Sequence, residues 1–541
     1  MIHYVCKYTP IELFAGFDEQ YQVLESMRKD YPDADRVGHA NLCGFGKAVI
    51  QAVYEGTVTQ IVLVNCCDVM RRVFDIIKKS GKCEFVYLLD LPHENKSCSR
   101  VFFQNQIECL KKSYQSFSGK AFDQKKFLAA FGKQESSSSE YVGIVGARVN
   151  EEMASFVREK LQMPVRNHTC TGNRLVCFPS VEEESLFADY SAALLSQIPC
   201  RRMDQNAGRK QLYNDPLLKA LIFHTMKFCD FSFGEYQEVK EDFPVPSLRI
   251  ETDYTVQSEG QLSTRLEAFR ETLTGEWRKG PMDTLKNYVA GVDSGSTSTD
   301  VVIMDRQKAI LATVILSTGK GAQASAEESL EQALKQAHLS RGEIGTIVTT
   351  GYGREHVLGG NETVTEITCH AKGAFFLNPR VRTVIDIGGQ DSKVIRLDDH
   401  GNVVNFVMND KCAAGTGRFM EMMAHTLGLQ LDELGALGDE WQEEITISSM
   451  CTVFAESEVV SLIARNKRVG DIVHALDKAV ASKTASLVNR LGLEGEYMIT
   501  GGVSRNLGVV HAIENKLGIR LFVSPMAQLC GAIGAALFAL E

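Results

Sequence analysis

The chain has 541 residues, a formal net charge of −10 and a pI of about 5.8. That length exceeds what one hydrophobic core usually organises, so we expect roughly three units of ordinary domain size. The acidic balance excludes nucleic acid or an anionic membrane as a partner bound by bulk charge.

The N-terminal sequence has no basic segment followed by an apolar run and a small-residue cleavage site. The longest late apolar stretch, GAIGAALFAL, is too short to cross a bilayer. We therefore expect a cytoplasmic protein that does not bind a membrane.

The first 250 or so residues alternate short β-branched segments with amphipathic ones. This alternation is typical of parallel α/β units. Helices are predicted at residues 46–56 and 151–162, and strands at 61–65, 85–90 and 141–149.

Two changes in composition predict domain boundaries. The polar run QESSSSE at 134–140 follows one α/β unit and precedes a new strand, which predicts subdomain 1 over residues 1–137 and subdomain 2 over 138–272. A charged stretch then precedes the strand signal YVAGVD. It predicts a linker over 273–286 and a C-terminal domain over 287–541.

The fifteen cysteines are unevenly distributed, with eleven before residue 230 and four after it. Because the cytoplasm is reducing, we do not expect a disulfide framework. The remaining explanations are metal, cluster or catalytic use, or burial as small apolar side chains.

Two segments of the C-terminal domain share one layout. VAGVDSGSTSTDVVIMD and TVIDIGGQDSKVIRLDD each hold an apolar strand that ends in Asp, a turn of Gly and small polar residues, and a second strand. Such turns expose N–H groups to phosphate oxygens, and Asp293 and Asp386 could hold Mg²⁺ directly or through water. A third turn, MITGGVSRN, follows another apolar strand and suits an adenosine.

These three turns resemble the two phosphate loops and the adenosine loop of the actin, sugar-kinase and heat-shock-protein ATPase superfamily, which has a duplicated ribonuclease-H-like α/β fold. The resemblance implies ATP as ligand. The implied catalytic residues are Asp293, Asp386 and Gln390. The implied nucleotide-binding residues are Ser294, Gly295, Ser296, Thr297, Ser298, Gly388, Gly389, Asp391, Gly501, Gly502 and Asn506.

The resemblance narrows over about residues 287–541. The motifs TTGYGRE, VIDIGGQDSKVI, NDKCAAGTGRFME, CTVFAESEVVSLI and TGGVSRN are similar to those of the activator ATPases of 2-hydroxyacyl-CoA dehydratases and the related benzoyl-CoA reductase ATPases. That family implies a homodimer with one [4Fe-4S] cluster on its twofold axis, to which each subunit gives two thiolates, here Cys412 and Cys451.

Both of these cysteines precede stretches with helical apolar spacing. Helix N-termini carry about half a positive charge and would stabilise an anionic cluster. We expect Cys369 and Cys530 to be core residues and His370 to be a packed histidine rather than a ligand.

The N-terminal half also carries family motifs. YTPIELFAGF, NLCGFGKAVIQ, NCCDVMRRVFD, RNHTCTGNR, QIPCRRMD and FHTMKFCDFSFGEY resemble the 2-hydroxyacyl-CoA dehydratase subunit family, particularly its double-cubane-cluster branch, over about residues 1–272. That branch implies an [8Fe-9S] cluster, two cubanes joined by a sulfide, with six iron positions for thiolates. The candidate ligands are Cys43, Cys66, Cys67, Cys170, Cys200 and Cys229.

This ligand set leaves one alternative open. Cys66 and Cys67 would point in opposite directions on a strand, so both can be ligands only if they lie in a turn. Otherwise Cys98 or Cys177 replaces one of them. Three further cysteines lie in apolar or amphipathic runs and are predicted to be structural: Cys6, Cys83 and Cys109.

The resemblances imply an ATP-dependent iron–sulfur reductase. A ferredoxin- or flavodoxin-type donor would reduce the bridging cluster, and ATP turnover would drive one electron to the N-terminal cluster for reduction or radical activation of a small substrate. One alternative is an activator whose N-terminal half only docks a separate 2-hydroxyacyl-CoA dehydratase. Another is a small-molecule kinase of the same superfamily with incidental cysteines.

Overall fold

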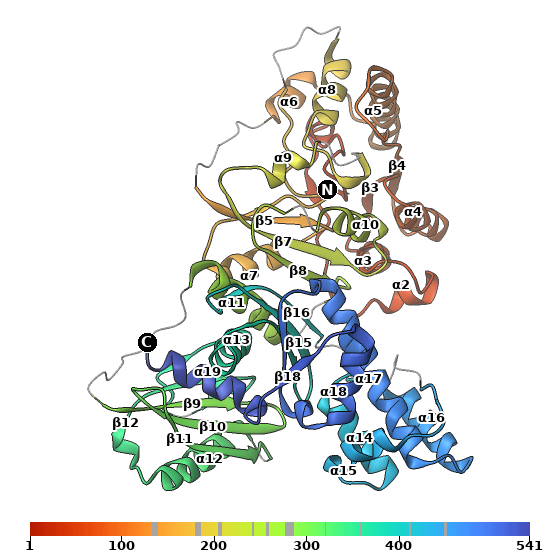
Figure 1. The fold of residues 1–541 in the computed structure, drawn as a ribbon. Coiled ribbons are helices and arrows are strands. Elements are labelled where there is room, and N and C mark those ends of the chain that lie inside the picture. Colours follow the sequence, from red (N-terminus) through yellow and green to blue (C-terminus); the bar gives the residue numbers. More distant parts are fainter. Residues whose placement is uncertain are drawn as a thin grey trace. The chain divides into compact units, whose positions relative to one another are not determined.

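The computed structural model of the chain describes residues 1–541 with ten gaps and forms two compact units, Met1–Glu259 and Gly260–Glu541 (Figure 1). The residues outside the description are 132–138, 179–184, 204–207, 241–242, 256–258, 276–285, 320, 358, 410–412 and 448–451. None of the helices in the described part of the chain combines the length and the apolar character that a membrane span requires.

The first unit contains two four-stranded sheets, and every strand pair in them is parallel. One sheet has the order β2-β1-β3-β4, with strands Ile2–Tyr4 (β1), Tyr21–Val23 (β2), Gln60–Val64 (β3) and Phe85–Leu89 (β4). The other has the order β6-β5-β7-β8, with strands Tyr141–Gly146 (β5), Val165–Asn167 (β6), Leu218–Met226 (β7) and Ser247–Thr252 (β8). The predicted pair of parallel α/β sheets is confirmed.

Helices follow the strands of this unit as the alternation predicted. Buried β-branched and apolar residues fill β3 and β5, which is usual for parallel strands covered on both faces. The helices are Glu12–Ala15 (α1), Pro32–Val37 (α2), Gly44–Tyr54 (α3), Asp68–Ser80 (α4), Ser97–Ser118 (α5), Gln124–Ala129 (α6), Glu151–Leu161 (α7), Leu186–Leu195 (α8), Lys210–Tyr213 (α9) and Asp230–Val239 (α10).

The second unit contains two five-stranded sheets of the same design. In each, three antiparallel strands are followed by two parallel ones. The first sheet, β11-β10-β9-β12-β13, has strands Tyr288–Ser294 (β9), Ser298–Asp305 (β10), Ile310–Ser317 (β11), Ile344–Thr350 (β12) and Glu362–Thr363 (β13). The second, β16-β15-β14-β17-β18, has strands Val381–Ile387 (β14), Ser392–Leu397 (β15), Val403–Asn409 (β16), Glu496–Thr500 (β17) and Leu521–Val523 (β18). The internal duplication is therefore confirmed.

The helices of the second unit pack closely where glycines allow it. A Cβ on Gly373 of α13 would lie 2.1 Å from the Cys530 carbonyl oxygen of α19. Cys369 and Cys530 are fully buried at this crossing, as expected of core residues. The helices are Glu259–Thr274 (α11), Ala322–Ala337 (α12), Glu366–Leu377 (α13), Gly417–Leu427 (α14), Leu431–Leu437 (α15), Thr452–Ala464 (α16), Val469–Leu491 (α17), Leu507–Leu517 (α18) and Cys530–Phe538 (α19).

Helix α11 lies in the part of the sequence predicted as subdomain 2, yet it packs within the second unit. Glu267 pairs with Arg354 at 2.7 Å. Glu271 accepts hydrogen bonds from the backbone N–H of Thr365 at 3.2 Å and from the hydroxyl of Thr368 at 2.6 Å. The other predicted boundaries fall beside residues outside the description and stay predictions.

Candidate functional site

The first unit encloses a cavity of about 410 Å³ where the strands of both sheets end. Val5, Gly146 and Met226 of its lining lie at the carboxyl ends of β1, β5 and β7, the usual place of ligand sites in open α/β sheets. Seven cysteines line it, and we call it the thiol cavity: Cys6, Cys43, Cys66, Cys67, Cys170, Cys200 and Cys229.

Three of these cysteines are helix N-caps. Cys43, Cys67 and Cys229 precede the first residues of α3, α4 and α10, each with extended backbone angles. The three thiols lie near one another. Burial raises the pKa of Cys43 to about 12, and the nearby Cys67 and Cys229 thiols contribute to this rise. Three helix N-termini therefore bring thiols and positive dipole ends to one cavity, an arrangement that favours an anion.

The other four thiols form a second neighbourhood. Burial, with the nearby Cys200 thiol, raises the pKa of Cys6 to about 12. Burial also raises the pKa of Cys170, with contributions from the Cys229, Cys200 and Cys6 thiols, so Cys170 lies near both groups of thiols. Cys66 lies next to both neighbourhoods, since its thiol donates to Cys67 and lowers the pKa of Cys67 to about 7.

The structure brings all six predicted N-terminal ligands to the cavity and leaves the two alternatives outside. Strand β3 ends at Val64, so Cys66 and Cys67 lie in the turn that both need in order to face one site. Cys98 and Cys177 are exposed and do not line the cavity.

Cys6 was predicted to be structural, and the structure places it in the cavity lining instead. Strand β1 ends at Tyr4, so Cys6 lies beyond the strand rather than within an apolar strand. Its position just after a strand was the signal in the sequence. Cys83 and Cys109 lie outside the cavity.

The spacing of the sulfurs tests what the cavity can hold. Among the described residues, the only three potential ligand atoms within 4.8 Å of one another belong to Glu366, His370 and Asp386. A tetrahedral Zn²⁺ with Zn–S bonds of about 2.3 Å would bring its sulfurs to about 3.8 Å from one another. The thiol cavity is therefore not preformed around a single ion, and its many separated thiols fit an iron–sulfur cluster of several irons.

The second unit has a cleft of about 540 Å³ between its two duplicated halves, which we call the nucleotide cleft. The turn between β9 and β10, the turn between β14 and β15, and the turn after β17 all line it. Every predicted catalytic and nucleotide-binding residue lines this cleft except Ser294, which is buried with its hydroxyl toward Gly353.

Glycines bring the turns close to one another. A Cβ on Gly389 would lie 2.0 Å from the Thr297 hydroxyl oxygen, so the two phosphate turns nearly touch across the cleft. Gly501 has a φ of +81° in the left-handed region, which favours glycine. The second turn also holds α14, because Gly388 and Gly389 carbonyl oxygens accept hydrogen bonds of 2.8 Å from the N–H groups of Gly417 and Arg418.

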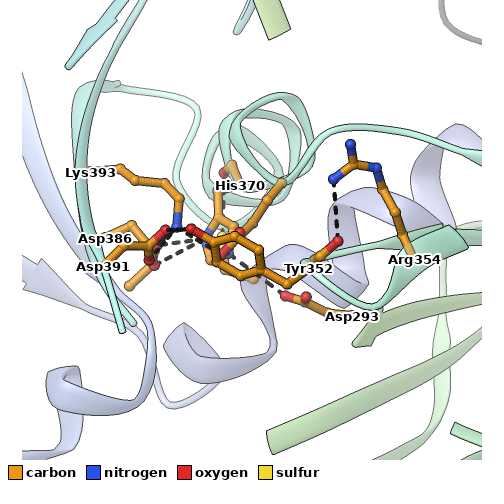
Figure 2. Close-up of polar contacts among 11 residues, drawn as sticks. Asp293, Tyr352, Arg354, His370, Asp386, Asp391 and Lys393 are labelled. Carbon is orange, nitrogen blue, oxygen red and sulfur yellow. Dashed lines mark hydrogen bonds and ion pairs between the residues drawn. The ribbon is translucent and has the colours of Figure 1, made fainter. Parts of the chain in front are cut away.

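A network of charges fills the floor of the nucleotide cleft (Figure 2). The buried Lys393 ammonium donates to Glu366 at 2.8 Å and to Asp391 at 2.7 Å. His370 lies 3.3 Å from Asp386 and 3.7 Å from Asp293. Burial opposes their charging, but these carboxylates raise the pKa values of Lys393 and His370.

Acids still outnumber bases there. Burial, with the nearby Asp293, raises the pKa of Asp300 to about 8, and burial raises the pKa of Glu366 to about 7. Carboxylates crowded in this way suit a hard cation such as Mg²⁺. The sequence did not single out Glu366, Lys393 or Asp300. His370 was expected to be only a packed residue, and it is buried but lines the cleft.

Cys412 and Cys451 lie outside the described residues. The helices that follow them are described: α14 begins at Gly417, and α16 begins at Thr452, the residue after Cys451. Their predicted role as cluster ligands stays a prediction.

A duplicated fold with two phosphate turns and a third Gly turn defines an ATPase of the actin and sugar-kinase type. Residues 290–539 match the BadF/BadG/BcrA/BcrD ATPase family, and residues 6–141 and 141–273 match the 2-hydroxyglutaryl-CoA dehydratase D-component. The chain belongs to the BadF/BadG/BcrA/BcrD ATPase family.

Several relatives of the chain are named as dehydratase activators. The chain is 42% identical over 254 residues to the 2-hydroxyisocaproyl-CoA dehydratase activator of Clostridioides difficile, covering 47% of this chain and 95% of the relative. It is 44% identical over 254 residues to the activator of lactoyl-CoA dehydratase of Anaerotignum propionicum, covering 47% and 98%. The solved structure of Acidaminococcus fermentans (R)-2-hydroxyglutaryl-CoA dehydratase component A is 42% identical, covers 47% of this chain and 98% of its own, and has a TM-score of 0.46.

Proposed function

We propose that the protein uses ATP hydrolysis to transfer low-potential electrons between two iron–sulfur sites of one chain. The first would be a [4Fe-4S] cluster held by Cys412 and Cys451 from each of two subunits. The second would be a double-cubane [8Fe-9S] cluster in the thiol cavity. The observation that carries this proposal is that a nucleotide cleft and a cavity lined by seven thiols occur in the same chain.

The nucleotide cleft supplies the groups that ATP hydrolysis needs. Backbone N–H groups and hydroxyls of the turn from Gly295 to Ser298 would bind phosphate oxygens, and the Gly turn at 501–502 would approach the adenosine. Asp293 and Asp386 would hold Mg²⁺ directly or through water, and Gln390 would orient the attacking water. Lys393 keeps Asp391 and Glu366 in place beside them.

The hydrogen bonds of the second phosphate turn supply a route from nucleotide to cluster. Because Gly388 and Gly389 bind the first residues of α14, a movement of this turn on hydrolysis moves the N-terminus of that helix. In the sequence, Cys412 precedes α14 by five residues. The nucleotide state would thus alter the surroundings of the bridging cluster.

Helix α16 offers the surface for a homodimer. Directly after Cys451 it exposes four large apolar side chains: Val453 (65%), Phe454 (64%), Val460 (53%) and Ile463 (41%). Contiguous exposed apolar surface marks interfaces. Pairing of two such helices would bring two copies of Cys451 together, and a ferredoxin- or flavodoxin-type donor would then deliver electrons there.

The thiol cavity supplies six or seven sulfur ligands, enough for the six iron positions of a double cubane. When bound, such a cluster supplies electrons at low potential for reduction or radical activation of a small substrate. The chain's own part is to hold the cluster by thiolates, shield it by burial and place three helix N-termini around it.

A second candidate function follows from the relatives. Two of those reported above are named dehydratase activators, and each match covers at least 95% of the relative but only 47% of this chain. On this view the N-terminal unit docks a separate 2-hydroxyacyl-CoA dehydratase, which receives the electrons. The number of thiols gathered in one cavity favours the reductase over this activator.

Iron content of the anaerobically purified chain separates the two. A reductase dimer holds about twenty Fe, and an activator dimer about four.

Cys412→Ser or Cys451→Ser should remove the smaller share. Cys200→Ala or Cys229→Ala should remove the larger share and abolish ATP-dependent reduction of acetylene, while ATP hydrolysis continues. Cys98→Ser, an exposed cysteine outside the cavity, is the matched control and should keep all the iron. Full iron and reduction in Cys200→Ala and Cys229→Ala would favour the docking role.

A further inference from the structure

Five arginines line the thiol cavity, and Lys7 lies near its thiols. Arg71 and Arg201 pair with Asp68 and Glu238. The other four cations differ in their partners: Lys7, Arg148, Arg202 and Arg209. Arg209 has an ordinary buried ion pair, in which its guanidinium bonds the carboxylate of Glu235 and both side chains are at most 2% exposed. Tyr213 also donates to Glu235, at 2.9 Å. The charge of Arg209 is therefore neutralised within the protein.

Arg148 is as buried as Arg209, at 2% exposure, but it has only neutral partners. Its guanidinium donates to the carbonyl oxygens of Val5, at 3.3 Å, and Leu24, and it lies 4.2 Å from the ring centroid of Phe45. Its Nε has no hydrogen-bond partner among the described residues. The nearby Tyr254 hydroxyl stays neutral, because burial raises the pKa of Tyr254.

Two further cations behave like Arg148. The fully buried Lys7 donates to the Asn173 side-chain oxygen at 2.9 Å and to the Ile198 carbonyl oxygen. The half-buried Arg202 donates to the carbonyl oxygens of Leu91 and Pro92, both at 2.7 Å. Among the described residues, no carboxylate forms an ion pair with either of them.

A buried cation without an anion is costly, because neutral carbonyls replace only part of the hydration that it loses. A lysine can respond by losing its proton, but an arginine cannot. Arg148 is thus a permanent positive charge in a buried position, and it forms no ion pair with a carboxylate of the described chain. The thiol cavity is where that counter-charge can bind, since Arg148 lines it.

We propose that Arg148 is the charge partner of the anionic group bound in the thiol cavity, with Lys7 and Arg202 in support. This inference rests on the proposed function, in which that group is an iron–sulfur cluster with thiolate ligands. Such a cluster is a polyanion, and reduction adds a further negative charge. Arg148 therefore stabilises the bound cluster and favours its reduced state, which makes the reduction potential less negative. Arg148 acts as a positioning charge and is not itself a ligand.

The test compares the full-length chain in iron-loaded form and after removal of iron with a chelator. Arg148→Gln keeps a polar side chain that can donate a hydrogen bond but removes the charge. We expect the thermal midpoint of the iron-free form to rise by about 2–4 °C, as for a gain of about 1 kcal/mol in a domain of this size. The extra stability gained on iron loading should be smaller than in the wild type, because the bound anion has lost a partner.

Two matched variants complete the design. Arg148→Lys keeps the charge and should restore the wild-type gain on iron loading. Arg209→Gln leaves Glu235 without its cation, so it should lower the midpoint in both forms and leave the gain on loading unchanged. A reductive titration followed by electron paramagnetic resonance should give a more negative midpoint potential for Arg148→Gln than for the wild type or Arg148→Lys.

Two results would overturn this inference. One is a loss of stability in iron-free Arg148→Gln as large as that of Arg209→Gln, which would show that Arg148 is already neutralised within the chain. The other is a wild-type gain on loading together with an unshifted potential in Arg148→Gln. If the wild-type chain held no cluster iron in its N-terminal unit, the proposed function would fail first, and the iron assay shows this independently of the variants.

Discussion

The nucleotide cleft and the thiol cavity differ in the sign of their unpaired charge. The cleft has more acidic than basic groups, whereas the cavity has a buried cation without an acidic partner. On the floor of the cleft, five carboxylates surround Lys393 and His370: Asp293, Asp300, Glu366, Asp386 and Asp391. In the cavity, Arg209 is paired with Glu235, but the buried Arg148 has only neutral oxygens as hydrogen-bond partners, and the acids Asp68 and Asp230 at its rim are exposed. On the proposed function, the cleft would take a cation that accompanies phosphates, and the cavity would take an anion.

The two sites are also built by different means. Cysteines at helix N-caps line the cavity, so the proposed ligands are side chains whose helices already provide a favourable dipole. Glycine turns line the cleft, so the proposed phosphate contacts would come from the backbone. Because a backbone contact needs room, adding a side chain to a cleft turn should impair nucleotide binding. Removing a cysteine side chain from the cavity should impair cluster binding.

The largest expected effect comes from adding a side chain in the cleft. In Gly389→Val the new Cβ would lie 2.0 Å from the Thr297 hydroxyl oxygen, so the two phosphate turns must separate. A displacement of about 1 Å can cost a hundredfold in rate, and we expect at least that loss in ATP hydrolysis with cavity iron unchanged. Gly342→Ala, whose Cβ meets nothing closer than 3.9 Å, is the control. Normal hydrolysis in Gly389→Val would show that this turn binds no phosphate.

Much of the fold and of the two sites could be predicted from the sequence, because these features depend on local sequence patterns. Alternating apolar segments predicted the parallel sheets, and the repeated Asp–Gly turns predicted the duplicated half-domains. The cavity cysteines follow strands or precede helices, so their positions were also visible. Cys6 was assigned to an apolar run because the end of β1 at Tyr4 is not marked by a turn residue.

Long-range partners could not be predicted. Lys393 looks like any strand lysine until the fold brings Glu366 on α13 next to it, 27 residues away. The lack of an acid beside Arg148 depends on every element that packs against it. Helix α11 belongs to the dehydratase match by sequence, yet its contacts are with the ATPase unit, and its amphipathic pattern does not say which unit covers it.

The next effect tests where α11 belongs. Glu271→Ala removes a buried carboxylate that accepts hydrogen bonds from Thr365 and Thr368 at the start of α13. Losing several hydrogen bonds to a charged group should cost about 3 kcal/mol. We expect the calorimetric transition of the ATPase unit to fall and that of the cavity unit to stay. Glu331→Ala, an exposed acid on α12, should change neither. A fall in the cavity unit alone would place α11 there.

The smallest expected effect concerns a buried carboxyl group that avoids a buried charge by staying protonated, without a bound ligand. Asp477 on α17 is fully buried, and neither of its carboxylate oxygens has a hydrogen-bond partner among the described residues. Burial, with a contribution from Asp439, raises its pKa to about 8, so the folded protein keeps it protonated at neutral pH. Unlike Arg148, Asp477 can become neutral by binding a proton, so we expect no ion to be bound beside it.

The sign of the pH dependence follows from this shift. The folded pKa lies above the unfolded value of 3.8, so the folded state binds the extra proton between those values. The stability of the ATPase unit should therefore decrease as pH rises from about 4 to 8 and level off above that, by up to about 1.4 kcal/mol per pH unit from this residue.

Asp477→Asn removes this contribution. Near pH 8 we expect a net gain of about 1 kcal/mol, limited because the asparagine amide is still a buried polar group. Denaturant unfolding at pH 5 and pH 8 measures it, and an equal effect of Asp477→Asn at both pH values would show that Asp477 is ionised in the folded protein throughout.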